Sequence, residues 1–227
     1  MTTHRAVFAS TPVSRTRGES GFSLVEILVV ITIIGLLMTF GFSAMQGARE
    51  ASKVTKCKKN LSEIGQALLI YKDQRNKGRW PREVGIRFLL TLHRHDQITG
   101  RSSELFLCPG TQDLNDLGPG TDMGSAYDDW EAITSDTISY AGRDAVAFPI
   151  RGANDAEQVL AADDNEFGSN HLNGLNVLYG DGGVQMIDVK IEYADVLADY
   201  PEFDDPSVGI PVGTDSPIEL LQVLRVD

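Results

Sequence analysis

Cysteine is scarce in this 227-residue chain, which contains only Cys57 and Cys108. An internal disulfide therefore has a single possible pairing. Proline is absent between Pro12 and Pro81, so a helix that begins near residue 22 meets no obligatory stop for almost 60 residues, or about 16 turns. The length suits one sizeable core and one long extra element rather than two full domains.

Basic residues become scarce after residue 82. The stretch Arg49–Arg82 carries ten Lys and Arg against three acidic residues, whereas Glu83–Asp227 carries seven against 27. An acidic surface repels phosphate backbones, which argues against nucleic acid as the main partner of this part. Four lysines at 53, 56, 58 and 59 have two interpretations: a solvated helix face, or contact with acidic lipid headgroups or an acidic neighbouring subunit.

Charge is almost missing from residues 22–42, a run of 21 residues whose one charged group is Glu26. As a helix this run spans roughly 30 Å, the thickness of a bilayer core. Arg5, Arg15 and Arg17 precede it. The positive-inside rule therefore predicts a single-pass inner-membrane protein with a cytoplasmic N-terminus and an extracytoplasmic C-terminal part.

A secretory signal peptide is the alternative for this segment. The apolar core of a signal peptide is about 7 to 15 residues and is followed by a cleavage site of small residues. The run here is longer, and the Phe42-Ser43-Ala44 sequence near its end matches an A-x-A site poorly. These features favour a membrane anchor.

Glu26 is the informative residue of the run. A carboxylate inside a membrane span costs several kcal/mol unless it is paired. No basic residue of the same span can pair with it. A positive group from a neighbouring subunit would supply the partner.

The sequence around Gly21 resembles the prepilin peptidase site of type IV pilins and type II secretion pseudopilins. The resemblance rests on Gly21-Phe22-Ser23-Leu24-Val25-Glu26, preceded by a basic leader and followed by an apolar run. It implies a leader of residues 1–21, cleavage after Gly21 and N-methylation of Phe22. It also implies that Glu26 meets the N-terminal amine of the adjacent subunit during assembly.

The anchor is expected to continue as one helix to about residue 79. Apolar residues recur at three- and four-residue spacings beyond the anchor, at Ala51, Val54, Leu61, Ile64, Leu68 and Tyr71. Residues 22–42 would form the transmembrane and filament-core segment, and residues 43–79 the periplasmic half. The helix would end at Lys77-Gly78, before Pro81.

The remainder is expected to form a globular α+β head over residues 80–194, followed by an acidic irregular tail over 195–227. The sequence predicts a helix at 84–92, short strands at 105–108, 138–141 and 159–162, a hairpin of 175–179 and 184–189, and one short helix near 217–224. Asp181-Gly182 in the hairpin turn supplies the positive backbone angles that a tight turn needs.

His171, nine residues and then Asp181-Gly182 form the one constellation that invites a catalytic role. This spacing resembles a subgroup of pseudopilin-like proteins defined by it. Further matches are Cys57 with Asn60-Leu61, Trp80-Pro81, Phe106-Leu107-Cys108-Pro109 and Asn176-Val177-Leu178. No nucleophile motif or third catalytic group accompanies the pair. We therefore expect a structural role, with Asp181 in the turn and His171 capping the loop, and no enzymatic activity.

The compartment that the resemblance implies is oxidising, so Cys57 and Cys108 are expected to be joined. Closing this loop of about 50 residues would stabilise the fold by about 4 kcal/mol in the chain-entropy model. Two buried, unpaired thiols are the alternative.

Metal sites are weakly indicated. Asp163, Asp164 and Glu166 crowd oxygen donors into one loop, and calcium takes six to eight such donors. Major pseudopilins, which the chain resembles, also bind calcium in a head loop. A solvated acidic surface is the alternative, and the pair His93 and His95 lacks further ligands in register.

Together these observations predict an α+β pilin-like fold, with a long N-terminal transmembrane helix packed on a small antiparallel sheet. The implied function is assembly into a periplasmic type II secretion or type IV pilus-like filament. The implied partners are a prepilin peptidase, an assembly platform with its ATPase, sister pseudopilins and the membrane. The rival hypothesis is a membrane-tethered module that binds calcium or a polymer and never polymerises.

Overall fold

The computed structural model describes residues 21–111, 123–150, 155–163, 171, 174–205 and 208–227. The chain forms two units, one up to Met45 and one from Gln46 to Asp227. Each is described by itself.

The first unit consists of the beginning of helix α1, which spans Leu24–Ile70. Its side chains up to Met38 are exposed, including every large apolar one, whose exposed fractions range from 45% to 82%. In the described part of the chain, no helix reaches the length and hydropathy that crossing a membrane requires.

The second unit contains the rest of α1, a π-helical turn at Tyr71–Arg75, helix α2 at Ile86–Arg94 and a five-stranded sheet. The strands are β1 Tyr140–Arg143, β2 Val159–Asp163, β3 Leu175–Tyr179, β4 Val184–Ile187 and β5 Leu224–Arg225. They are antiparallel and lie in the order β4-β3-β2-β1-β5. The predicted α+β class with a long N-terminal helix and a small antiparallel sheet is confirmed.

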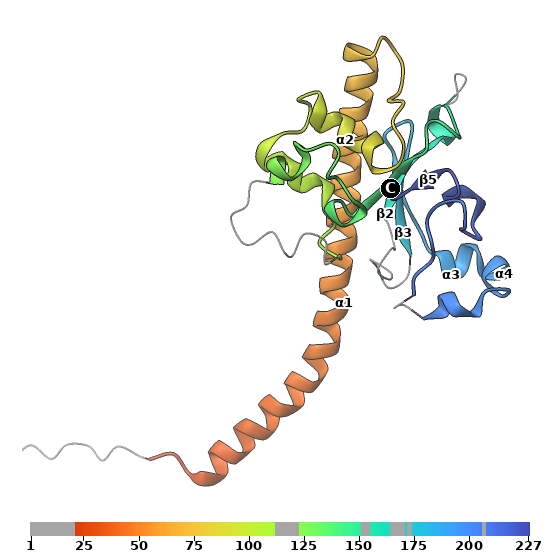
Figure 1. The fold of residues 1–227 in the computed structure, drawn as a ribbon. Coiled ribbons are helices and arrows are strands. Elements are labelled where there is room, and N and C mark those ends of the chain that lie inside the picture. Colours follow the sequence, from red (N-terminus) through yellow and green to blue (C-terminus); the bar gives the residue numbers. More distant parts are fainter. Residues whose placement is uncertain (1–20, 112–122, 151–154, 164–170, 172–173, 206–207) are drawn as a thin grey trace, which may run out of the picture. The chain divides into compact units, whose positions relative to one another are not determined.

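Each face of the sheet has its own core. On one face, Tyr140 of β1, Leu160 of β2 and Leu178 of β3 join Leu61 and Leu68 of α1, together with α2. Figure 1 shows the sheet beside α1 in this unit. The other face carries a second cluster built from strand residues and from residues near the C-terminus, namely Ala141, Val159, Ala162, Leu175, Val177, Ile187, Val189, Ile210, Ile218, Leu221 and Leu224.

The C-terminal segment therefore differs from the irregular tail expected from residue 195. Ile210, Ile218, Leu221 and Leu224 are each at most 4% exposed. The chain ends in β5, which pairs with β1 and lies at the edge of the sheet (Figure 1). An acidic composition hid these apolar positions, which are spaced irregularly because they come from loop, 3-10 and strand segments.

Residues 105–108 also differ from the strand expected there. Gly100–Phe106 forms a 3-10 helix, and Leu107 directly after it has extended backbone angles. Phe106 is buried against Tyr127, with ring centroids 5.5 Å apart. A short apolar run predicts burial correctly here, but it does not distinguish a strand from another buried conformation.

The β3–β4 hairpin approaches α1 closely at Gly65. A Cβ atom built on Gly65 would lie 2.6 Å from Leu178 Cδ1 and 3.4 Å from Gly182 Cα. Gly182 has a φ of +83°, which the tight turn requires, and its own Cβ would lie 3.1 Å from Leu69 Cδ1. Two glycines thus let the turn rest on the helix.

Gly65→Ala should weaken this contact, and Gly47→Ala is its matched control in the same helix. No atom lies within 4 Å of a Cβ at Gly47, while both changes gain about 1 kcal/mol of helix propensity. We expect Gly65→Ala to be less stable than Gly47→Ala by about 1 to 3 kcal/mol, the usual cost of overpacking. Urea unfolding of the detergent-solubilised chain measures the difference. Equal stabilities would contradict the close packing.

Candidate functional site

The first helical turn of α1 is held by a reciprocal cap. The backbone N–H of Ser23 donates to Glu26 Oε2 at 2.8 Å, and the N–H of Val25 donates to Ser23 Oγ at 3.3 Å. A Ser with a Glu three residues later is the capping-box arrangement, which satisfies donors that the helix leaves without partners. Phe22, directly before this turn, is 82% exposed.

Glu26 has a hydrogen-bond donor in its own helix terminus. No basic residue lies in the apolar run, but the backbone N–H of Ser23 donates to the Glu26 carboxylate. The N-terminal end of a helix also carries partial positive charge, which favours a carboxylate. Glu26 therefore caps the beginning of the helix.

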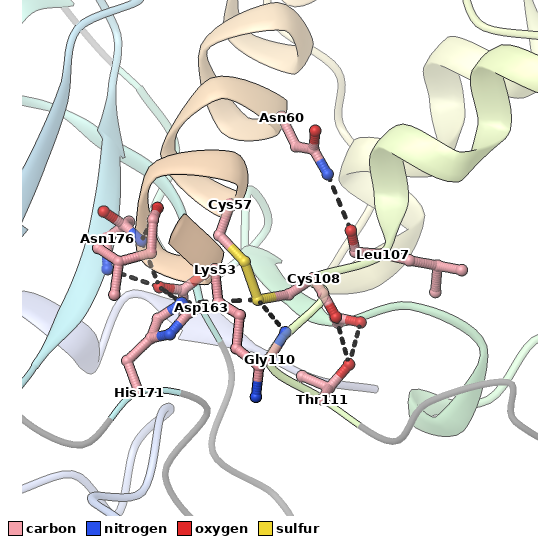
Figure 2. Close-up of a disulfide and its surroundings, with 12 residues drawn as sticks. Lys53, Cys57, Asn60, Leu107, Cys108, Gly110, Thr111, Asp163, His171 and Asn176 are labelled. Carbon is pink, nitrogen blue, oxygen red and sulfur yellow. Dashed lines mark hydrogen bonds and ion pairs between the residues drawn. A yellow bond between two sulfur atoms is a disulfide. The ribbon is translucent and has the colours of Figure 1, made fainter. Parts of the chain in front are cut away.

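A disulfide ties α1 to the segment after the 3-10 helix. Cys57 and Cys108 are bonded, with their Cα atoms 5.1 Å apart, and both are buried. Asn60, less than one turn further along α1, donates from Nδ2 to the Leu107 carbonyl at 2.9 Å (Figure 2). One covalent and one polar link thus fix the same short segment to the helix.

His171 lies beside this disulfide and is 3% exposed. Its Nδ1 is 3.2 Å from Glu50 Oε1. Its Nε2 is 3.5 Å from both Cys108 Sγ and Asp163 Oδ2 (Figure 2). Figure 2 shows the imidazole between α1 and the end of β2.

Asp163 ends β2 and is fully buried. Its Oδ2 accepts hydrogen bonds from Asn176 N at 2.7 Å and from Asn176 Nδ2 at 2.9 Å. Burial raises the pKa of the Asp163 carboxyl to about 6, although His171 and the Asn176 donors act in the opposite direction. Asn176 Nδ2 also lies 3.5 Å from the Val54 carbonyl of α1. The buried polar groups therefore connect the helix to both central strands.

Asp181 lies elsewhere, in the exposed β3–β4 turn, where its Oδ1 accepts from Gly183 N at 2.7 Å. His171 precedes β3 and lies near Cys108 and Glu50, whereas Gly182 follows β3 and contacts Leu69. The spacing of nine residues is thus the length of one strand with its flanks. The motif positions β3 on α1 at two places.

The predicted calcium ligands are only partly described. Asp164 and Glu166 lie outside the described residues, and Asp163 faces nitrogen and sulfur atoms as well as the Asn176 amide. Calcium prefers a set of oxygen ligands, so a calcium site at this loop stays a prediction.

The second histidine pair is not brought together around one point. His93 Nε2 is 3.2 Å from Asp128 Oδ1, while the His95 ring lies against Tyr71 with centroids 5.1 Å apart. A metal bound by both His93 and His95 does not fit these partners.

Two comparisons match part of the chain. Residues 16–42 match the prokaryotic N-terminal methylation motif. The type II secretion system core protein G of Pseudomonas aeruginosa is 38% identical over 56 residues, which are 25% of this chain and 39% of that protein. No solved structure matches the chain. The chain is thus similar at its N-terminal motif to type IV pilin-like pseudopilins.

The methylation motif gives the capped turn at Ser23 its context, because the matched residues include Gly21, Phe22 and Glu26. The match to the curated relative leaves about three fifths of that relative uncovered. The motif match therefore describes the beginning of the helix and does not reach the buried cluster around His171.

Sequence reasoning missed Glu50 and the true surroundings of Asp163. Glu50 lies seven residues before Cys57, so the two share a helix face, and this spacing was the available signal. Asp163 was assigned to an exposed acidic loop because acidic residues follow it. Nothing in the sequence marks it as the buried end of a strand.

Loss of the disulfide should cost stability without disturbing the N-terminal helix. The bond closes a loop between residues 51 positions apart, and the chain-entropy model gives about 4 kcal/mol for a loop of this size. We expect the double variant Cys57→Ser, Cys108→Ser to lose up to about that free energy of unfolding. Urea titration in the presence of a chelator measures it. Reduced wild-type protein is the control and should lose a similar amount, and an unchanged stability in both would contradict a stabilising bridge.

Proposed function

We propose that this chain is a pseudopilin-like subunit that a prepilin peptidase cuts after Gly21. The mature subunit then assembles through residues 22–38 into a periplasmic filament of the type II secretion or type IV pilus-like kind. The observation that carries the proposal is an apolar helix with every large side chain exposed, which begins at a methylation motif. The role is structural rather than catalytic.

The exposed helix supports assembly on physical grounds. Soluble monomers rarely expose contiguous apolar patches larger than a few hundred Å². The segment from Phe22 to Met38 leaves its apolar side chains uncovered, so it needs either lipid or other helices around it. A subunit that is first held in a membrane and then enters a filament core meets these two environments one after the other.

The location follows from the same segment. We infer an N-terminus anchored in the inner membrane with its basic leader in the cytoplasm, and a head in the periplasm. The Cys57–Cys108 bond suits this placement, because disulfides persist in oxidising compartments.

Contacts between heads can use the charge asymmetry of the chain. Lys59 pairs with Glu63 at 3.1 Å, and Lys53 lies 3.9 Å from Glu50. Lys56 and Lys58 are exposed and form no ion pair with a described residue. Because the head is acidic, these two lysines can attract the head of a sister subunit.

Processing is tested by the mass and N-terminal sequence of the protein purified from its native membrane. We expect the chain to begin at a methylated Phe22. Gly21→Leu should leave the chain uncut, while Gly18→Leu, a glycine change three residues upstream, should be processed normally. A start near Ala44 would identify a secreted protein without an anchor and overturn the proposal.

Assembly is tested by variants that separate the charge of Glu26 from its capping role. Glu26→Gln can still accept the Ser23 N–H but carries no charge, whereas Glu26→Ala loses both. Ser23→Ala removes only the hydroxyl half of the cap. If a charge meets the neighbouring subunit, both Glu26 variants should lose at least tenfold in filament yield, equivalent to about 1.4 kcal/mol or more, and Ser23→Ala should assemble.

Crosslinking of adjacent subunits in native membranes measures the yield. Normal assembly of Glu26→Gln alongside failure of Glu26→Ala would assign the effect to the cap. Normal assembly of both variants would show that assembly does not need Glu26, whereas an absence of crosslinked subunits in the unmodified protein would favour the tethered binding module.

A further inference from the structure

We propose that the reduced form of this protein holds one zinc ion between Cys57, Cys108, Asp163 and His171. The donor atoms of these four residues all lie within 4.8 Å of one another, and all four residues are buried. Cys57 comes from α1, Cys108 from the segment after the 3-10 helix and Asp163 from the end of β2. His171 lies four residues before the first residue of β3 (Figure 2). This site is independent of the proposed assembly function.

The separations fit a tetrahedral ion. Zinc bonds of about 2.1 Å to nitrogen or oxygen and about 2.3 Å to sulfur place neighbouring ligand atoms about 3.4 to 3.7 Å apart. His171 Nε2 lies 3.5 Å from Cys108 Sγ and 3.5 Å from Asp163 Oδ2. The two sulfurs are bonded in the oxidised form, and breaking that bond lets them separate to the distance that zinc needs.

The type of donor selects the ion. Two sulfurs, one imidazole nitrogen and one carboxylate oxygen form a set that zinc accepts and calcium does not. The N–H of Gly110 donates to Cys108 Sγ at 3.3 Å. A donor at this place stabilises a negative thiolate, the form of cysteine that binds a metal.

Two buried oxygens of the cluster have no hydrogen-bond partner in the described part of the chain, namely Asp163 Oδ1 and Asn176 Oδ1. Buried acceptors are normally satisfied, so each of these needs a reason. A cation held beside Asp163 would compensate a carboxylate that otherwise has donors on only one of its oxygens.

Glu50 orients the imidazole for this purpose. With Nδ1–H donated to Glu50 Oε1 at 3.2 Å, Nε2 carries the lone pair, and it faces Cys108 and Asp163. A carboxylate behind a ligating histidine is the usual outer partner of a zinc site. A surface pocket lined by Glu50, Val54, His171 and Met186 leads to the imidazole and gives the ion a path of entry.

The chemistry balances with a phosphine as reductant. The phosphine supplies two electrons, which break the Cys57–Cys108 bond. It takes up the oxygen of one water molecule and becomes the phosphine oxide. The two protons of that water convert the two sulfurs to thiols. Zinc then displaces both thiol protons as it binds. The disulfide and the zinc complex thus close the same loop in two alternative ways. A newly exported chain that is still reduced would close it with zinc.

The test uses the full-length chain in detergent, reduced with the phosphine and freed of it without oxygen. We expect one zinc per reduced chain and none per oxidised chain by elemental analysis. Cobalt in place of zinc should give thiolate charge-transfer bands and the strong visible bands of a tetrahedral ion. Zinc should also protect both thiols of the unmodified protein from alkylation.

Variants identify the two ligands that are not cysteine. Asp163→Asn and His171→Gln should each weaken zinc binding by at least about tenfold and change the visible cobalt bands. His93→Gln is the matched control, because His93 also lies against an aspartate, Asp128, but outside the cluster. The oxidised variants should keep the disulfide and the helical circular dichroism of the parent, which shows that they fold.

Three outcomes would overturn the site. They are an absence of stoichiometric zinc in the reduced parent, alkylation that zinc does not slow, and unchanged cobalt spectra in both folded variants. The first two outcomes are measured on the unsubstituted protein. They therefore decide the proposal even if a variant fails to fold.

Discussion

The docking of the sheet onto α1 is the constraint on which the second unit depends. Between Glu50 and Leu69 the helix receives a covalent bond, buried polar contacts and a close approach of the hairpin turn. Asn176 supplies two donors to the buried carboxylate of Asp163, and His171 lies beside it. Each of these contacts joins residues far apart in sequence, so the positions of the strands depend on their packing against α1.

Local patterns predicted the elements that carry their own signals. The β3–β4 hairpin was predicted because alternating apolar residues surround an Asp-Gly turn, and β3 has the predicted bounds. The short apolar run at residues 105–108 predicted a strand, because four residues are too few for periodicity to distinguish a strand from another buried conformation. The C-terminal strand β5 has only two residues, and its place is decided by the edge of β1 rather than by its own sequence.

The candidate sites also divide into those marked by a local motif and those formed by residues distant in sequence. The methylation motif is contiguous, so Gly21, Phe22 and Glu26 could be read directly from the sequence. The partnership of His171 with Glu50 spans 121 residues, and no spacing rule covers such a distance. The His171–Asp181 pair suggested one site, but a strand lies between them and separates them. Sequence proximity thus indicated a shared role in positioning β3, not contact.

The position of β5 has a consequence for the order in which the second unit can fold. Residues 210–225 contribute both an edge strand and part of the second core. Until they are in place, β1 presents the unpaired backbone groups of an open sheet edge, with which a strand of another molecule can pair. Protection of this edge therefore depends on a segment that is synthesised after all the other strands.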